Sequence, residues 1–117
     1  MMNEQQLAAY CLGLPGAQED YKWGGIRVLS VAGNKMFAVF GLAGDSLSLK
    51  VGKELFLGYV DRPGFRPAPY LARAHWVSLA LPLAVSDDEV RELLRRSHQL
   101  VVRRLPKKTQ VGLLLDL

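Results

Sequence analysis

Nucleophilic and metal-binding side chains are scarce in this sequence, which contains one cysteine and two histidines. Cys11 lies within an apolar helical pattern, where a thiol serves more often as a small core residue than as a nucleophile. His75 and His98 lack the spacing of a metal site, such as two histidines four residues apart beside a glutamate. We therefore expect no catalytic residues, no metal ion and no cofactor, and we do not expect an enzyme.

Glycine pairs and neighbouring carboxylates can also serve catalysis, but here they have simpler explanations. The glycines within 24–25 and 41–44 lack the spacing of a nucleotide-phosphate loop. Asp87 and Asp88 follow Ser86 at the start of a helical pattern, where carboxylates interact favourably with the positive end of the helix dipole. These patterns predict turns and a helix start rather than acid–base chemistry.

Basic residues are the more informative group, because 15 of them against 11 carboxylates give a net charge of +4. Those in the C-terminal third have structural explanations. The arginines within 91–96 can pair with Asp87 or Glu92 at i,i+3 or i,i+4 spacing. At the expected end of the same helix, where cations interact favourably with the helix dipole, the sequence has Arg103, Arg104, Lys107 and Lys108. Four cations within six residues are more than capping requires.

A second group of cations has no evident acidic neighbour apart from Glu54 and Asp61. Its members are Lys50, Lys53, Arg62, Arg66 and Arg73. We expect this group to contact phosphate, with Lys107 and Lys108 as further candidates. Tyr70 and Trp76 lie nearby in the sequence and could stack on bases, although a place in the core is the alternative for either ring.

The length of 117 residues and a hydrophobic content of 50% predict a single domain over 1–117 with one core. The longest apolar stretches, 77–85 and 111–115, fall short of the roughly 20 residues needed to cross a bilayer. The N-terminal residues lack the pattern of a secretory signal, and a lone cysteine cannot form an internal disulfide. We expect a cytoplasmic protein that does not associate with membranes.

Helical periodicity and end signals predict three helices. Asn3 and Gln6 form a capping box for the first, and Ser86 and Glu89 form one for the last, which Pro106 ends. The expected ranges are Glu4–Leu12, Lys53–Tyr59 and a long helix from Ser86 whose apolar face reaches Leu105. The apolar tail, 111–115, could dock on the body or add an edge strand.

Strand signals predict an antiparallel meander, with strands at Ile26–Val31, Lys35–Phe40, Ser46–Val51 and, further on, His75–Leu81. Gly33-Asn34 is expected to form a two-residue hairpin turn. The proline-rich segment 61–69 is expected to be an irregular loop. Together these elements predict an α+β fold with two layers, in which helices pack on one face of an antiparallel sheet of four to five strands.

The faces of the meander follow from the expected turn. Leu29 and Val31 should share one face with Met36, Ala38 and Phe40. On the other face, Val28 should lie beside Phe37 and Val39. Both faces are thus partly apolar, and the helices can cover only one of them. This pattern is our reason to consider a homodimer.

Several short motifs, taken in order, are similar to those of one family. They are Trp23-Gly24, Lys35-Met36-Phe37-Ala38, Leu47-Ser48-Leu49-Lys50, Pro67-Ala68-Pro69-Tyr70-Leu71 with Arg73 and Trp76-Val77, and then Ser97 and Leu105-Pro106-Lys107-Lys108. On these residues the chain resembles the MmcQ/YjbR family of small bacterial proteins, along nearly its whole length. The resemblance implies a two-layer YjbR-like domain, similar to CyaY-like and secretion-chaperone-like folds, with helices on one side of an antiparallel sheet.

The resemblance also implies DNA binding, through a wing-like arrangement of hairpins. Many members of the family have an Asn-Lys-Lys/Arg-His-Trp run, where this chain has Ala72-Arg73-Ala74-His75-Trp76. If that run contacts phosphate, this chain should bind more weakly or elsewhere. The leading expectation is a DNA-binding protein with little sequence preference. A homodimeric adaptor that uses its second sheet face is the alternative, and an enzyme of unrecognised type is the third.

Overall fold

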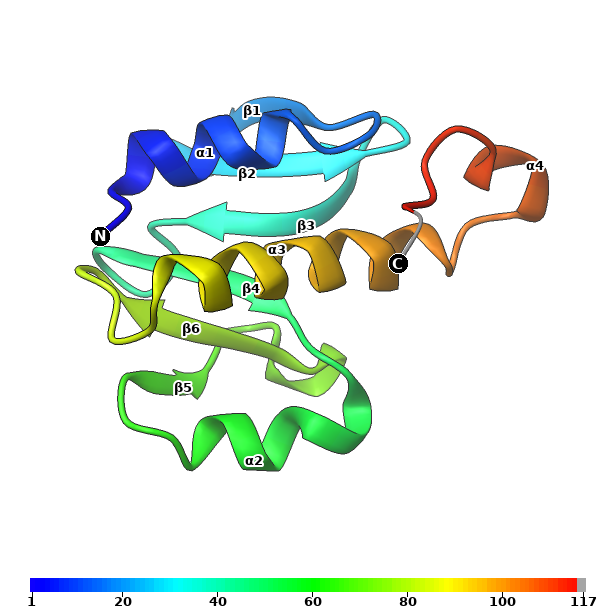
Figure 1. The fold of residues 1–117 in the computed structure, drawn as a ribbon. Coiled ribbons are helices and arrows are strands. Elements are labelled where there is room, and N and C mark those ends of the chain that lie inside the picture. Colours follow the sequence, from blue (N-terminus) through cyan, green and yellow to red (C-terminus); the bar gives the residue numbers. More distant parts are fainter. Residues whose placement is uncertain (116–117) are drawn as a thin grey trace.

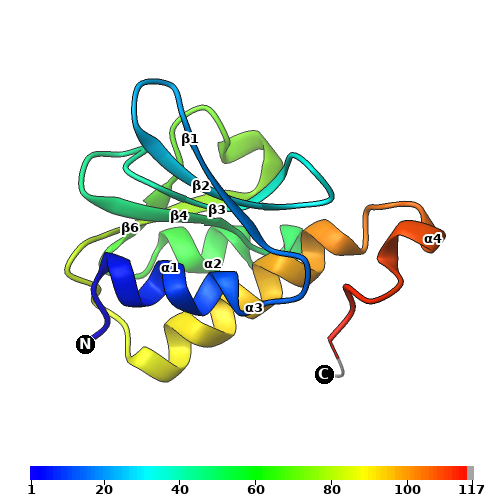
Figure 2. The same ribbon diagram turned by 90° about the horizontal axis from the view of Figure 1, so that it is seen from above.

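A six-stranded antiparallel sheet forms one layer of the protein, and three helices pack against one of its faces (Figures 1 and 2). The structure, a computed structural model, describes residues 1–115. Its elements are α1 (Glu4–Leu12), β1 (Gln18–Lys22), β2 (Ile26–Val31), β3 (Lys35–Phe40), β4 (Ser46–Lys50), the 3-10 turn η1 (Lys53–Leu55), α2 (Phe56–Val60), β5 (Phe65–Pro67), the 3-10 turn η2 (Ala72–Ala74), β6 (Trp76–Ala80), α3 (Asp87–Val102) and α4 (Lys107–Gln110). The strand order is β1-β2-β3-β4-β6-β5. The α+β class and the one-sided helix layer are confirmed.

The sheet has two strands beyond the four that were located in the sequence, and both of these strands lie at its edges. β1 is polar and almost entirely exposed, so it lacks the apolar alternation that reveals a half-buried strand. β5 has only three residues and includes Pro67, which an edge strand tolerates because one side of its backbone has no partner. The prediction of four to five strands was therefore wrong, and so was that of an irregular loop over all of 61–69.

The β2–β3 hairpin contains a β-bulge that the sequence analysis did not anticipate. Leu29 pairs with Ala38, as expected from the predicted turn, but Ser30 pairs with Met36, so that Phe37 is the extra residue. The connection consequently has three residues, and Ala32 and Gly33 within it have positive φ angles. The bulge reverses the alternation of faces on the turn side. It places Phe37 in the helix-covered core and Met36 on the other face, the opposite of our prediction.

Helix α3 is the central element of the helix layer and crosses in front of β3 and β4 in the view of Figure 1. Val90, Leu94 and Val102 on its apolar face are fully buried against the sheet. Helix α1 packs beside it, and both arms of the capping box between Asn3 and Gln6 are present. None of the helices in the described part of the chain is long and apolar enough to cross a membrane.

The C-terminal part differs from the prediction in two ways. Helix α3 ends at Val102, before Leu105, and the short helix α4 follows Pro106. Residues 111–115, which come next, form no edge strand. It docks on α3 instead, because the Gln99 amide donates to the carbonyl of Leu113 (3.0 Å) and accepts from the backbone N–H of Leu115 (3.0 Å).

The start of α3 has half of the predicted capping box. The Ser86 hydroxyl accepts a hydrogen bond from the backbone N–H of Glu89 at 3.1 Å. The Glu89 carboxylate does not return to the Ser86 backbone, because it pairs with Arg62 on the loop before β5. This pair connects α3 to the far edge of the sheet.

Candidate nucleic-acid interface

The sheet face opposite the helices carries a second, smaller apolar cluster. Val28, Val39 and Trp76 are buried there. Residues 68–75, which include η2, cover part of this face through Ala68 and Leu71, and Figure 2 shows this segment on the side of the sheet away from the helices. Trp76 is only 4% exposed, so it belongs to the core and is not available for stacking on a base. Both sheet faces are partly apolar, as predicted.

The uncovered part of this face contains a cavity of about 370 Å³, which we call the apolar cavity. It is lined by Trp23, Ile26, Met36, Leu42, Tyr70 and Leu71. Two of these residues project strongly into solvent, since Trp23 is 63% exposed and Tyr70 is 94% exposed. The exposed aromatic pair on this face is thus Trp23 and Tyr70, whereas the sequence had suggested Tyr70 and Trp76.

A second cavity, of about 350 Å³, adjoins the first, because Met36 and Leu71 line both of them. Three cations line this basic cavity: Lys35 at the start of β3, Lys50 at the end of β4, and Arg104 just after α3. No carboxylate lines it, and among residues 1–115 none forms a salt bridge with any of these three cations. We refer to the apolar and the basic cavity together as the open face.

Lys50 is positioned for the open face by groups from three different elements. Its backbone N–H donates to the Ser97 hydroxyl of α3 (2.9 Å), which in turn donates to the carbonyl of Phe37, the bulge residue, at 2.6 Å. Its amino group donates to the carbonyl of Ala74 in η2. Partial burial and the nearby Arg104 guanidinium lower the pKa of Lys50 from its ordinary value. A bound anion would relieve this repulsion.

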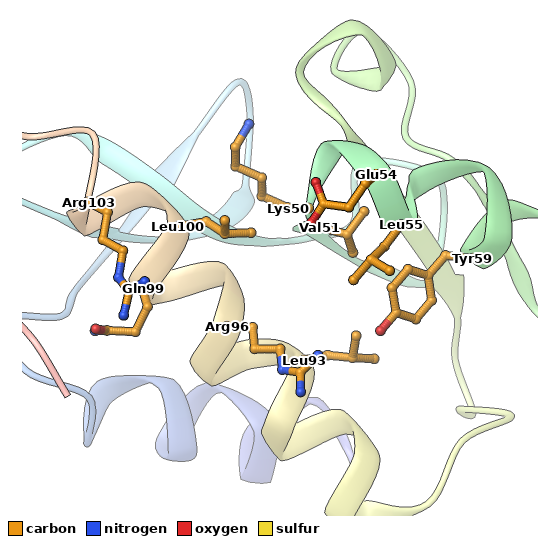
Figure 3. A pocket seen from close by; sticks show the side chains of 11 residues that line it. Lys50, Val51, Glu54, Leu55, Tyr59, Leu93, Arg96, Gln99, Leu100 and Arg103 are labelled. Carbon is orange, nitrogen blue, oxygen red and sulfur yellow. The ribbon is translucent and has the colours of Figure 1, made fainter. Parts of the chain in front are cut away.

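A third cavity, of about 220 Å³, lies between α3 and the segment after β4, on the other side of Lys50 (Figure 3). Lys50 is part of its lining, together with apolar side chains and with Glu54, Arg96, Gln99 and Arg103. Figure 3 shows Lys50 extending away from Gln99 and Arg96. Because Lys50 pairs with Trp76 across β4 and β6, its side chain lies on the same face as that of Trp76. The Lys50 amino group therefore belongs to the open face rather than to the third cavity.

Arg62 has a partner that the sequence did not reveal. Its guanidinium forms two hydrogen bonds with Glu89, one of them at 3.0 Å, and lies 4.9 Å from the centre of the Phe65 ring. The partner is 27 residues away, so no local pattern could identify it. Arg62 therefore has a structural partner, although the sequence analysis had placed it among the cations without an acidic neighbour.

The other predicted cations are exposed but dispersed. Arg66 on β5 donates to the carbonyl of Ala43 at 2.9 Å. The remaining predicted cations are exposed and form no salt bridge with any described residue. They are Lys53, Arg73, Lys107 and Lys108. The last two begin α4 rather than end α3, so the helix-dipole explanation offered for them was wrong. Of the predicted set, only Lys50 lines the basic cavity.

Sequence reasoning missed three residues of the open face: Trp23, Lys35 and Arg104. Trp23 and Lys35 stand in short motifs of the family resemblance, but neither had been assigned to a site. Arg104 belongs to the dense cation cluster that exceeded the needs of capping. That excess was the available signal, but only Lys107 and Lys108 were taken from the cluster as candidates.

Cys11, His75 and His98, which were considered for catalysis, all have packing or hydrogen-bond partners within the fold. Cys11 is fully buried, and burial raises its pKa to about 12, so its thiol stays protonated at neutral pH. The buried ring of His98 bonds the Pro15 carbonyl (2.8 Å) and the Gln99 amide (2.8 Å), while His75 packs edge-on against Phe56. Within the described residues, no three Cys, His, Asp or Glu side chains form a possible metal site.

Comparison with known proteins agrees with this architecture. The sequence model of the YjbR family matches residues 12–100. The uncharacterised protein YjbR of Escherichia coli strain K12 is 30% identical over 114 residues, which cover 92% of this chain and 93% of that protein. The crystal structure of a Deinococcus radiodurans protein has a TM-score of 0.83 at 27% identity, covering 97% of this chain and 88% of that one. A crystal structure from Pseudomonas syringae has a TM-score of 0.71 at 27% identity, covering 86% and 99%.

The fold and the site define a two-layer α+β protein whose sheet has one helix-covered face and one face that is partly open. The chain belongs to the YjbR family. The family resemblance that the short sequence motifs indicated is therefore confirmed.

Proposed function

We propose that this protein is a non-enzymatic nucleic-acid-binding protein that contacts phosphates through its open face with little sequence preference. The observation that carries the proposal is the basic cavity, in which Lys35, Lys50 and Arg104 come together and no carboxylate of residues 1–115 is part of the lining. Cations without acidic partners attract polyanions, and the arginine fork matches the geometry of a phosphate. Phosphates carry no sequence information, so contacts of this kind position a nucleic acid without selecting a sequence.

The set of binding residues follows from the geometry rather than from the sequence order. Lys35, Lys50 and Arg104 form its centre. Arg73 extends this set on one side. It lies on η2, the turn whose Ala74 carbonyl accepts a hydrogen bond from the Lys50 amino group. Arg62 is left out, because Glu89 already neutralises it.

Fluorescence anisotropy of labelled duplex and single-stranded DNA, measured over a range of salt concentrations, tests the proposal. We expect binding at low salt that weakens steeply as salt rises. In the variant Arg104→Gln, the slope of log affinity against log salt should decrease by about 0.9 for a duplex or about 0.7 for a single strand, the value of one lost phosphate contact. The matched control is Arg95→Gln, which removes the same charge from a residue that pairs with Glu92 on α3.

Two results would contradict the proposal. One is the absence of binding at low salt, or binding that salt does not affect. The other is an equal loss of affinity in Arg104→Gln and Arg95→Gln, because net charge alone would then explain the interaction.

The exposed apolar cavity supports a second candidate function, a homodimeric adaptor that covers this cavity with a second copy. Trp23 and Tyr70 would then be interface residues, as exposed aromatic side chains often are. Light scattering coupled to size-exclusion chromatography tests this alternative. A protein that remains monomeric at high concentration rules it out.

A further inference from the structure

We propose that the nucleic acid bound by this protein is single-stranded, with an unpaired base held between Trp23 and Tyr70 in the apolar cavity and adjacent phosphates in the basic cavity. This inference rests on the proposed function and specifies its ligand. It assigns a role to Trp23 and Tyr70, which have none if the protein contacts only phosphates.

The first argument is the exposure of two aromatic rings in one cavity. Trp23 and Tyr70 are 47 positions apart in the sequence, and the fold brings both to the rim of the apolar cavity. Neither ring is packed into the core, since they are 63% and 94% exposed. Exposed rings over an apolar floor provide the surfaces on which unpaired bases stack, largely independently of base identity.

The second argument is the backbone at these two positions. Trp23 has a φ of 50° and Tyr70 a φ of 67°, in the left-handed region that bulky residues rarely adopt. This conformation costs free energy, and such strain is concentrated at binding and catalytic sites. At both positions the strained residue carries one of the two exposed rings, so the strain and the stacking surface coincide.

The third argument is the continuity of the two cavities. Met36 and Leu71 line both, so the apolar cavity opens beside Lys35, Lys50 and Arg104. A nucleotide chain has a matching arrangement, because each flat base, which suits the apolar cavity, is joined through a sugar to a negatively charged phosphate, which suits the basic cavity. The volume of about 370 Å³ lies within the range of small-ligand sites, which begins at about 300 Å³.

The arrangement favours a single strand over the other occupants. Bases in a duplex are stacked and paired, so their faces cannot reach Trp23 and Tyr70. A second copy of this chain would bring another net charge of +4 next to the three cations of the basic cavity. Charge complementarity therefore favours a polyanion with accessible base faces.

The test compares three fluorescent probes of equal length in anisotropy titrations: a thymidine oligonucleotide, the corresponding duplex, and an abasic strand that has the phosphates without bases. We expect the protein to bind the thymidine strand more tightly than either other probe. The variants Trp23→Ala and Tyr70→Ala should each weaken that binding about 5-fold or more, as the loss of one stacked base does. Their salt slopes should match that of the unmodified protein, because no phosphate contact is lost.

The control variant is Leu57→Ala, which removes a side chain that is 74% exposed on α2 and lines neither cavity of the open face. Its affinity should be unchanged. Intrinsic fluorescence gives a second signal, because a base on Trp23 should quench its emission, and this quenching should be absent in Trp23→Ala. Circular dichroism of each variant shows that a lost affinity is not a lost fold.

The outcomes separate this inference from the proposed function. If no probe binds at low salt, both fail. If the probes bind with a steep salt dependence but duplex and abasic strands bind as tightly as the thymidine strand, or the two aromatic variants bind normally, the inference alone is overturned. A dimer that dissociates in Trp23→Ala also overturns it and assigns the apolar cavity to a second copy.

Discussion

Lys50 illustrates how a single cation acquires its position from groups distant in the sequence. Its backbone is fixed by Ser97, its amino group by the Ala74 carbonyl, and its pKa is lowered by burial and by Arg104. A sequence pattern shows only that Lys50 ends a strand. It cannot show that Arg104, 54 positions further on, lies beside it, nor that Glu89 neutralises Arg62. Of the candidate site, the sequence therefore indicated Lys50 and Tyr70 but not Trp23, Lys35 or Arg104.

A prediction at the residue level concerns His98. Its fully buried ring accepts from the Gln99 amide and donates to the Pro15 carbonyl, so it is neutral, and burial lowers its pKa below the usual 6.5. Below about pH 6.5 the unfolded chain takes up a proton that the folded protein does not, so stability should fall as the pH falls from this value toward the lower folded pKa. Urea unfolding at a series of pH values between 7.5 and 5 measures this.

The variants His98→Gln and His75→Gln separate this effect from other titrating groups. We expect His98→Gln to be less stable at pH 7.5 but to lose most of the decline between pH 7 and pH 5. His75→Gln should retain the decline. An unchanged decline in His98→Gln would show that another group causes it.

Among the elements, the β-bulge and α3 depend on each other. The Ser97 hydroxyl joins the Phe37 carbonyl at the bulge to the Lys50 N–H at the end of β4, a point where the β3–β4 pairing has already ended at Ala38 and Leu49. Because the side chain of Ser97 is fully buried, no water replaces these bonds when it is lost. This one hydroxyl links the core of the helix layer to the edge of the open face.

We therefore expect Ser97→Ala to lower the free energy of unfolding by about 1–3 kcal/mol, the cost of leaving buried partners unsatisfied. Chemical denaturation measures the change. The comparison variant is Ser86→Ala, which removes the N-cap of the same helix and should cost about 1 kcal/mol. A Ser97→Ala variant with the stability of the unmodified protein would show that the bridge contributes nothing.

The elements themselves show what periodicity can and cannot reveal. The bounds of α1, β2 and β3 were predicted correctly, because capping residues and half-buried alternation are local signals. The bulge was missed, since one extra residue changes the register without changing the composition. β1 and β5 were missed because edge strands bury too little to require an apolar pattern.

At the scale of the whole molecule, the two sheet faces have different roles. The helices cover one face and form the main core, whereas the other is covered only in part, by residues 68–75. The uncovered part combines an apolar cavity with a basic one. Strand β3 contributes Met36 to both cavities and Lys35 to the basic one, and β4 contributes Lys50. The sequence predicted that the second face would be apolar, but the combination with cations arises only from the fold.

The most direct test of this account is a map of amide chemical shifts, recorded by NMR on the ¹⁵N-labelled protein during titration with a thymidine oligonucleotide. We expect the largest changes around the open face, at Trp23, Lys35, Lys50, Tyr70 and Arg104, and small changes along α1. Changes concentrated on α1, or none at saturating oligonucleotide, would contradict the assignment of nucleic-acid binding to the open face.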